Sequence, residues 1–188
     1  MNKVTLGPQR LMYPRPALLV GATVNGKPNF MTVGGGGVAS GEPPMISLPI
    51  RHPCHTLKGI MQNREFSINT PSVDLVKETD YCGMVSGAKV DKVKNCGFDL
   101  FYGQLRSAPL IAQCPINLEC RLAHALTLGS HCLVIGQVVE SHVTEECMIG
   151  DEPDVRKINA LIFNMEQKRY FSFGEAVGDA WQVGKQIK

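Results

Sequence analysis

Residues suited to binding an anion lie close together around position 51. Arg51 ends a predicted strand, and Thr56 follows shortly afterwards as the predicted cap of a short helix. A phosphate placed there would meet a guanidinium, a hydroxyl and the amides at the positive end of the helix dipole. The arginine should contribute about 1.5–3 kcal/mol and an exposed dipole about 0.3–1 kcal/mol, so the arginine dominates. Without further context, a solvated arginine at a strand end is the more common case.

A run of glycines, Gly34 to Gly37, removes the side chains from four successive positions. One interpretation is a close approach of backbone N–H groups to a bulky planar ligand or to its phosphate tail. The other is a β-bulge or barrel corner, which also favours glycine. The run alone does not decide between them.

Asn29 and Thr32 flank Phe30-Met31 on the strand that leads to these glycines. Their side chains could hydrogen-bond the polar rim of a bound ligand. For an isolated Asn or Thr, a role in a turn or strand is more common. These two residues therefore become informative only together with the others.

Other reactive side chains carry weaker signals. His52, Cys54 and His55 cluster as metal ligands do, but no second cluster supplies the remaining tetrahedral positions, so we expect no metal site. His131 opens an apolar strand and is a candidate catalytic residue, with a hydrogen-bonded structural histidine as the alternative. The chain contains neither a G-x-S-x-G nor a G-x-G-x-x-G motif, so hydrolase-elbow and Rossmann sites are unsupported.

The elements that would position these residues are mostly strands. The apolar run Ala17 to Val24 predicts a buried strand, and Asn25-Gly26 favours a tight hairpin turn. The return strand is expected to run from Asn29 through the glycines to Val38. Met45 to Arg51 alternates in polarity, and because Pro49 cannot donate to a ladder this strand is expected at an edge or bulge.

Two short helices are expected among these strands. The first has Thr56 as its N-cap and one apolar face, made by Leu57, Ile60 and Met61. The second has Ser72 as its cap and spans roughly Val73 to Tyr81. Phe66 and Ile68 indicate a strand between them.

Strand signals resume after Cys114. Alternation from Ile116 to Leu122, a turn at Gly129-Ser130 and a long strand from Cys132 to Val143 are expected, with shorter strands at Leu161–Phe163 and Tyr170–Phe171. Strands dominate and do not alternate regularly with helices, which argues against a doubly wound fold. We therefore expect a mainly β protein with short helices, built as a closed or partly open antiparallel barrel.

Composition limits the class of protein. A chain of 188 residues fits one domain, taken as 1–188. The net charge of +2, without a basic run, predicts no nucleic-acid partner. No apolar run approaches the ~20 residues of a membrane span, and the first residues lack the apolar stretch of a signal peptide. Seven cysteines without a CxxC pair indicate reduced thiols, so we expect a cytoplasmic protein.

Taken together, the segments resemble the flavin reductase-like family, and its flavoredoxin branch in particular. The resemblance rests on short motifs in a fixed order: Pro16…Gly26-Lys27-Pro28-Asn29-Phe30-Met31-Thr32, Pro43-Pro44, Arg51-His52-Pro53-Cys54-His55-Thr56 and Glu65-Phe66-Ser67-Ile68-Asn69. It extends more weakly through Ser86–Lys92, Gly129–Val138 and Tyr170…Gly174-Glu175.

This resemblance implies a six-stranded antiparallel split β-barrel of the Greek-key type. It also implies a homodimer with one flavin mononucleotide (FMN) per subunit near the dimer interface. By position, it places Asn29, Met31 and Thr32 beside the flavin, and Arg51, His55 and Thr56 around its phosphate. Lys89 and Lys92 lie in a segment expected to approach the cofactor. Relatives often carry hydroxyl or other small side chains at Gly34 to Gly37, so backbone amides or water would replace those contacts here.

The function that follows is an FMN-dependent oxidoreductase. Electrons from NAD(P)H or another donor would pass through bound FMN to free flavin, ferric iron or a partner protein. NAD(P)H would dock transiently over the flavin face. The alternative is a non-catalytic FMN-binding electron carrier, and a more distant one is a barrel without flavin.

Overall fold

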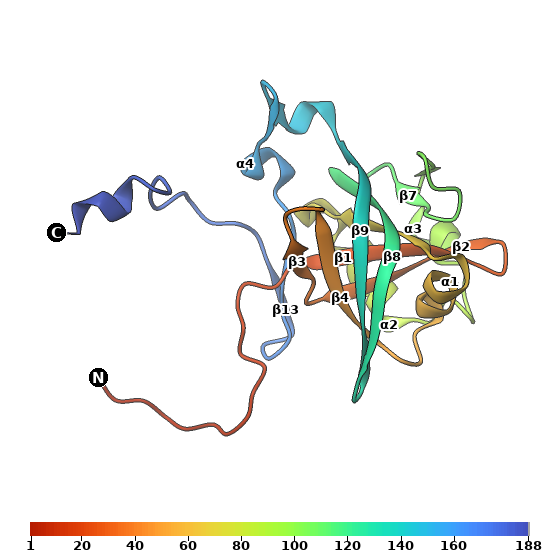
Figure 1. The fold of residues 1–188 in the computed structure, drawn as a ribbon, viewed down its shortest axis with the longest axis horizontal. Helices are drawn as coiled ribbons and strands as arrows, with labels where there is room; N and C mark the ends of the chain where they lie inside the picture. The colour runs from red at the N-terminus through yellow and green to blue at the C-terminus, as the bar shows by residue number, and fades with distance from the viewer. Residues whose placement is uncertain (188) are drawn as a thin grey trace.

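The computed structural model describes residues 1–187. Seven strands form one antiparallel sheet in the order β2-β1-β5-β8-β9-β4-β3 (Figure 1). Six are the long strands expected of the barrel, and β3 adds four residues. The strands are β1 Ala17–Val24, β2 Lys27–Gly34, β3 Gly37–Ser40, β4 Met45–Arg51, β5 Glu65–Thr70, β8 Ile116–Leu128 and β9 His131–Val143. The predicted mainly β architecture is confirmed.

The glycine run explains why this sheet is curled. β2 and β3 lie at opposite ends of the strand order, yet only Gly35 and Gly36 separate them in the chain. Because two residues span about 7 Å at most, the two ends of the sheet must come together. A Cβ at Gly36 would lie 2.7 Å from Leu18 Cδ1 and 2.8 Å from Leu48 Cδ2, so a side chain would clash here. Gly36 is therefore a barrel corner.

The prediction of one unbroken strand from Asn29 to Val38 is wrong for the same reason. β2 pairs with β1 as far as Gly34, whereas Gly37 already pairs with Ser47 on β4. The chain has to leave one partner strand and join the other between these two glycines.

The two predicted turns are confirmed, whereas β4 is not an edge strand, because it lies between β9 and β3. Asn25 (φ 50°) and Gly26 (φ 78°) connect β1 to β2 with the positive φ angles of a tight hairpin turn. Gly129 (φ 48°) begins the turn between β8 and β9. The pairing of β3 with β4 ends at Ser47, so Pro49 lies where one side of β4 is open.

The first helix, α1 (His55–Asn63), differs in two details from the expectation. Its N-cap is Cys54, and Thr56 is buried within the first turn. Met61 is 47% exposed, because the buried face is centred on Gly59 and Ile60 instead. A Cβ at Gly59 would lie 2.4 Å from the Thr23 carbonyl oxygen, so this side of the helix rests directly on β1.

The second helix begins as predicted at Ser72. The Ser72 hydroxyl accepts a hydrogen bond from the Asp74 N–H at 3.3 Å, and a 3-10 turn (η1, Val73–Leu75) leads into α2 (Val76–Met84). Shorter elements follow it along the chain: α3 Lys92–Cys96, β6 Leu100–Phe101, β7 Leu110–Ile111, η2 Glu145–Cys147, β10 Met148–Ile149, β11 Glu152–Pro153, α4 Val155–Ile158, β12 Ile162–Asn164, β13 Arg169–Phe171 and η3 Val183–Gln186. Among them, β12 and β13 are the two short strands expected near the end of the chain.

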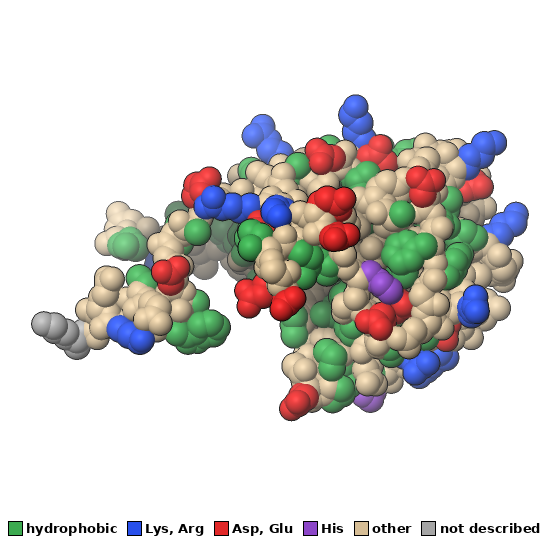
Figure 2. Space-filling model, turned by 90° about the horizontal axis from the view of Figure 1, so that it is seen from above, with side chains coloured by type: hydrophobic (Ala, Val, Ile, Leu, Met, Phe, Trp, Pro, Cys, Tyr) green, Lys and Arg blue, Asp and Glu red, His purple; other side chains and the backbone are tan. Residues whose placement is uncertain are grey.

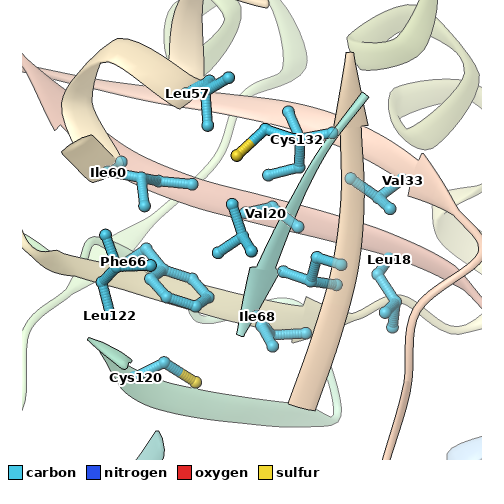
Figure 3. Packing of buried hydrophobic residues seen from close by; sticks show 14 residues of the cluster. Leu18, Val20, Val33, Leu57, Ile60, Phe66, Ile68, Cys120, Leu122 and Cys132 are labelled. Carbon is cyan, nitrogen blue, oxygen red and sulfur yellow. The ribbon is translucent and has the colours of Figure 1, made fainter. Parts of the chain in front are cut away.

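The main hydrophobic core fills the barrel beneath α1 (Figure 3). Phe66 and Val20 are fully buried, and each such side chain contributes about 1.5–3 kcal/mol relative to exposure. Cys120 and Cys132 belong to this cluster, as expected for cysteines in apolar segments.

Both ends of the chain extend away from the barrel (Figures 1 and 2). Residues 1–14 are exposed, and so are residues 171–187. They carry large hydrophobic side chains in contact with solvent, among them Leu6, Val177, Trp181 and Ile187. Within residues 1–187, no helix combines the length and apolarity that a membrane span requires.

Candidate functional site

A cleft of about 1010 Å³ lies beside β2 and the start of α1. Its other walls come from the end of α2, the segment leading into α3, and the hairpin of β12 and β13. The volume is at the upper end of the roughly 300–1,000 Å³ found for sites of small ligands and cofactors. Seven of the eight predicted cofactor-binding residues line it: Asn29, Met31, Thr32, Arg51, His55, Thr56 and Lys92.

The start of α1 is open to an anion. Within residues 1–187 the N-cap Cys54 makes no side-chain capping hydrogen bond, and the first turn contains no acidic residue. Arg51 lies exposed just before the cap and lines the same cleft. The uncapped amides, the dipole and the guanidinium therefore combine at one place, as a phosphate requires.

His131 lies next to this anion site. It is the cross-strand partner of Arg51 between β9 and β4, and it lines the cleft. Its Nδ1 is 2.7 Å from the Ser130 hydroxyl oxygen. The sequence suggested His131 as a candidate, but the pairing with Arg51 depends on the register of strands far apart in the chain.

The two histidines near α1 lie in different environments. His52 Nε2 is 3.0 Å from the Gly129 carbonyl oxygen, outside the cleft. His55 lines the cleft, and its burial, together with the charges of Lys58 and Lys92, lowers its pKa. These effects favour the neutral imidazole of His55 over its charged form. Among residues 1–187, no three His, Cys, Asp or Glu side chains are grouped so that they could hold a metal.

Asn29 connects three walls of the cleft. Its buried side chain donates from Nδ2 to Thr56 Oγ1 at 2.7 Å, which joins β2 to α1. A Cβ at Gly87 would lie 1.7 Å from Asn29 Oδ1, so the segment between α2 and α3 rests directly on this amide. Thr56, which lies inside the first turn of α1, is thus engaged by Asn29.

Thr32 has a comparable role on the same strand. Its hydroxyl donates to the Thr79 carbonyl oxygen and so holds α2 against β2. Met31 is half-buried, lines the cleft and packs against the barrel core. The sequence identified both residues, but their contacts with α2 and the core required the structure.

The two candidate lysines are placed differently. Lys92 is 4% exposed, and its Nζ donates to the carbonyl oxygens of Phe30 at 2.8 Å and Cys82 at 2.7 Å. Burial lowers the pKa of Lys92, although the neighbouring Cys82 opposes that shift. Lys89 is exposed in a turn outside the cleft lining, where its N–H donates to the Ser86 carbonyl at 2.9 Å.

An aromatic wall was not predicted. Phe163 and Tyr170 line the cleft from β12 and β13, with ring centroids 5.2 Å apart. A Cβ at Gly34 would lie 2.5 Å from Phe163 Cδ1, so this glycine makes room for the ring. The Tyr170 hydroxyl donates to Asp80 Oδ1 at 2.9 Å, which ties the hairpin to α2. Gly34 and Phe163 are more than a hundred residues apart, so no local pattern in the sequence indicates that this glycine makes room for the ring.

The N-terminal segment closes one end of this wall. Arg15 Nε donates to the Met12 carbonyl at 2.8 Å, and its guanidinium pairs with Glu166 at 3.0 Å. The Tyr13 hydroxyl donates to the same carboxylate at 2.7 Å. Glu166 therefore joins this segment to the turn between β12 and β13.

Fold and site together define a mainly β barrel protein with a cleft suited to a phosphate-bearing ligand. Comparison with known proteins gives its family. The flavin reductase like domain matches residues 10–165. A flavoredoxin from Methanosarcina acetivorans is 36% identical over 100% of both chains, with a TM-score of 0.95. The flavoredoxin of Desulfovibrio vulgaris (Miyazaki F) is 31% identical over 97% of this chain and 100% of that one, with a TM-score of 0.91.

A more distant structure, an FMN-binding protein from Thermus thermophilus, shares the fold. It is 22% identical over 95% of this chain and 97% of that one, with a TM-score of 0.79. The chain therefore belongs to the flavin reductase-like family, and its similarity to the two flavoredoxins places it on the flavoredoxin branch. This confirms the expected split-barrel fold and indicates a flavin-related redox role.

Proposed function

We propose that this protein binds FMN in the cleft and acts as a flavin-dependent oxidoreductase. The observation that carries the proposal is the uncapped, acid-free start of α1 beside Arg51, facing a cleft of cofactor size. Arg51 and the first-turn amides would hold the phosphate. Asn29, Met31 and Thr32 would lie along the flavin, as the resemblance implies. Family membership and the similarity to flavoredoxins support this assignment.

FMN, when bound, supplies the redox chemistry, accepting and passing on one or two electrons. The residues of this chain would bind and orient it. Phe163 and Tyr170 offer apolar surface that excludes water from one side of the cleft, and the buried ammonium of Lys92 provides a fixed positive charge nearby. The imidazole rings of His55 and His131 also line the cleft.

The proposed electron donor is NAD(P)H, docking transiently at the open cleft, or another reductant. The proposed acceptors are free flavin, ferric iron or a partner protein. The alternative function is an electron carrier that holds FMN tightly without oxidising NAD(P)H. The similarity to flavoredoxins supports this alternative as well.

The visible spectrum of the purified protein separates these functions. We expect a flavin absorption spectrum, after FMN addition if necessary, that bleaches rapidly when NADH or NADPH is mixed in by stopped flow. A flavin spectrum without useful bleaching by either nicotinamide would favour the electron carrier. Protein that shows no bound flavin even after FMN addition would refute both functions and favour the barrel without flavin.

We further propose a homodimer, supported by the exposed apolar side chains on both ends of the chain. Large exposed apolar surfaces commonly mark interaction sites. Light scattering should then give a mass near twice 20.5 kDa. A stable FMN-loaded monomer would contradict the dimer. We propose the cytoplasm as the compartment, consistent with seven cysteines that are all free thiols.

A further inference from the structure

Two cysteine side chains face each other at the wall of the cleft, and one of them, Cys82, belongs to its lining. Cys82, near the end of α2, and Cys96, the last residue of α3, have their Sγ atoms 4.0 Å apart. Both pack in a second hydrophobic cluster with Phe30 and Phe98. Cys82 is only 1% exposed, whereas Cys96 is partly accessible to solvent. This arrangement gives one thiol that solvent can reach and a second one directly behind it.

The chain between these cysteines forms a wall of the cleft. Residues 83–87 and Lys92 line the cleft, and all of them lie inside the loop that a Cys82–Cys96 bond would close. Lys92 and Cys96 are one helical turn apart on α3 and so project from the same side of it. Lys92 Nζ already donates to the Cys82 carbonyl oxygen at 2.7 Å, which means that α2 and α3 meet at Cys82 in the reduced protein.

We propose that Cys82 and Cys96 are a redox modification site: a peroxide closes them reversibly into a disulfide, which fixes the wall between α2 and α3. To form the bond, the sulfurs have to move from 4.0 Å to about 2.05 Å. Cys96 is the last residue of the five-residue α3, and Gly97 follows it as the helix cap with φ 63°.

The chemistry proceeds in two balanced steps. The Cys96 thiolate attacks hydrogen peroxide, which gives the sulfenic acid of Cys96 and hydroxide. The Cys82 thiol then attacks the Cys96 sulfur, the S–O bond breaks, and the departing hydroxide takes up the proton that Cys82 releases and leaves as water. Two thiols are oxidised to one disulfide and one peroxide is reduced. A dithiol such as dithiothreitol reverses the change by thiol–disulfide exchange.

The environment of the two thiols determines the rate of disulfide formation. Burial raises the pKa of Cys82 to about 12 and also raises the pKa of Cys96, so both are protonated at neutral pH. Because the thiolate is the nucleophile, disulfide formation should be slow at pH 7 and faster at pH 9.

Peptide mapping tests the site directly on the full-length protein. Trypsin separates the two cysteines, since Glu78–Lys89 contains only Cys82 and Asn95–Arg106 contains only Cys96. After peroxide treatment, removal of excess peroxide and alkylation, mass spectrometry should find these two peptides linked and reduction should release them. Thiol titration in denaturant should fall from seven to five, because two of the seven thiols are consumed.

Two variants test whether Cys82 and Cys96 are the cysteines that form the bond. Cys96→Ser should abolish the linked peptide, while Cys147→Ser, at a buried cysteine outside this cluster, should leave it unchanged. If Cys82 and Cys96 both remain alkylatable, or if Cys82 is linked to Cys114 instead, the proposal is wrong. Peptide mapping of the natural protein tests the proposal even if a variant does not fold.

A second readout concerns the cofactor and rests on the proposed function. The oxidised protein with a Cys82–Cys96 bond should release FMN more slowly than the reduced protein. The Cys96→Ser variant should release FMN at the same rate before and after peroxide treatment. Equal rates of FMN release from the oxidised and the reduced natural protein would show that the disulfide does not fix the cleft wall. Failure to bind FMN at all would refute the proposed function and leave the peptide mapping as the test of the disulfide.

Discussion

The side chain of Asn29 donates a hydrogen bond to Thr56 Oγ1 at 2.7 Å, and this bond joins the strand β2 to the first turn of α1. Both residues are buried, with Asn29 6% and Thr56 1% exposed. The bond therefore fixes the position of the helix start at which Arg51 and the uncapped amides converge.

Thr56→Val should destabilise the protein without changing the shape of the core. It leaves the buried Asn29 amide without this acceptor, which costs about 1–3 kcal/mol. Urea unfolding of the cofactor-free protein measures this loss. Thr144→Val, at an exposed threonine, is the control and should be close to neutral. Equal unfolding free energies for the two variants would show that the Asn29–Thr56 bond contributes nothing.

Gly87→Ala should disturb the cleft wall. The added Cβ would lie 1.7 Å from Asn29 Oδ1, so the segment between α2 and α3 has to shift. Overpacking of this kind costs about 1–3 kcal/mol and should also weaken FMN binding. At Gly37 a Cβ would meet no atom of the described chain within 4 Å, so Gly37→Ala is the control. Unchanged stability and affinity for Gly87→Ala would contradict this packing.

The two candidate lysines should behave differently. Lys92→Met removes the ammonium that bonds two backbone carbonyls in the wall of the cleft, which is worth about 1.5–3 kcal/mol. We expect the free energy of unfolding to fall by about this amount, and FMN binding to weaken because Lys92 holds the wall of the cleft. Lys89→Met, at the exposed lysine, should leave affinity unchanged. Fluorescence titration with FMN measures both, and a larger effect for Lys89 would reverse the assignment.

A buried carboxylate outside the cleft should make stability depend on pH. Glu119 is fully buried and accepts hydrogen bonds from the N–H groups of Leu105 at 2.6 Å and Gln104 at 3.1 Å. Its Oε1 also lies 2.9 Å from His142 Nε2. Burial raises the pKa of Glu119, but the hydrogen bonds from His142, Leu105 and Gln104 outweigh it, so the pKa is lowered.

The sign of the pH effect follows from this lowered pKa. Glu119 contributes stability above its unfolded pKa of about 4.3, and that contribution is lost as the pH falls through the lower folded value. Glu119→Gln should therefore cost about 1–3 kcal/mol at pH 7 and much less in acid. Thermal or urea unfolding between pH 7 and pH 3 tests this. The same loss at both ends of the range would exclude the titration of Glu119 as the cause.

The local pattern of the sequence was sufficient for most of the barrel. Alternation and turn residues gave β1, β5 and the long β8–β9 hairpin, since each depends on neighbouring residues. The break between β2 and β3 was missed, because it depends on which strands Gly34 and Gly37 join. The cap of α1 was misplaced because the helix begins at His55, so that Cys54 precedes it and Thr56 lies inside its first turn.

The site was only partly predictable for the same reason. Motif positions identified Arg51, Asn29 and Lys92, which the structure brings to one cleft. Phe163 and Tyr170 come from a hairpin whose sequence has no feature that links it to β2. Their place beside Gly34 follows from long-range packing that no local pattern encodes.

The comparison of FMN with riboflavin tests the phosphate site most directly. Riboflavin lacks the phosphate, so Arg51→Ala should weaken FMN binding by about tenfold to a hundredfold and riboflavin binding hardly at all. Arg121→Ala, at an exposed arginine on β8, should affect neither ligand. Calorimetric titration of the three proteins with both ligands gives the answer. A selective loss for FMN supports the site at Arg51 and the start of α1, and equal losses for both ligands would contradict it.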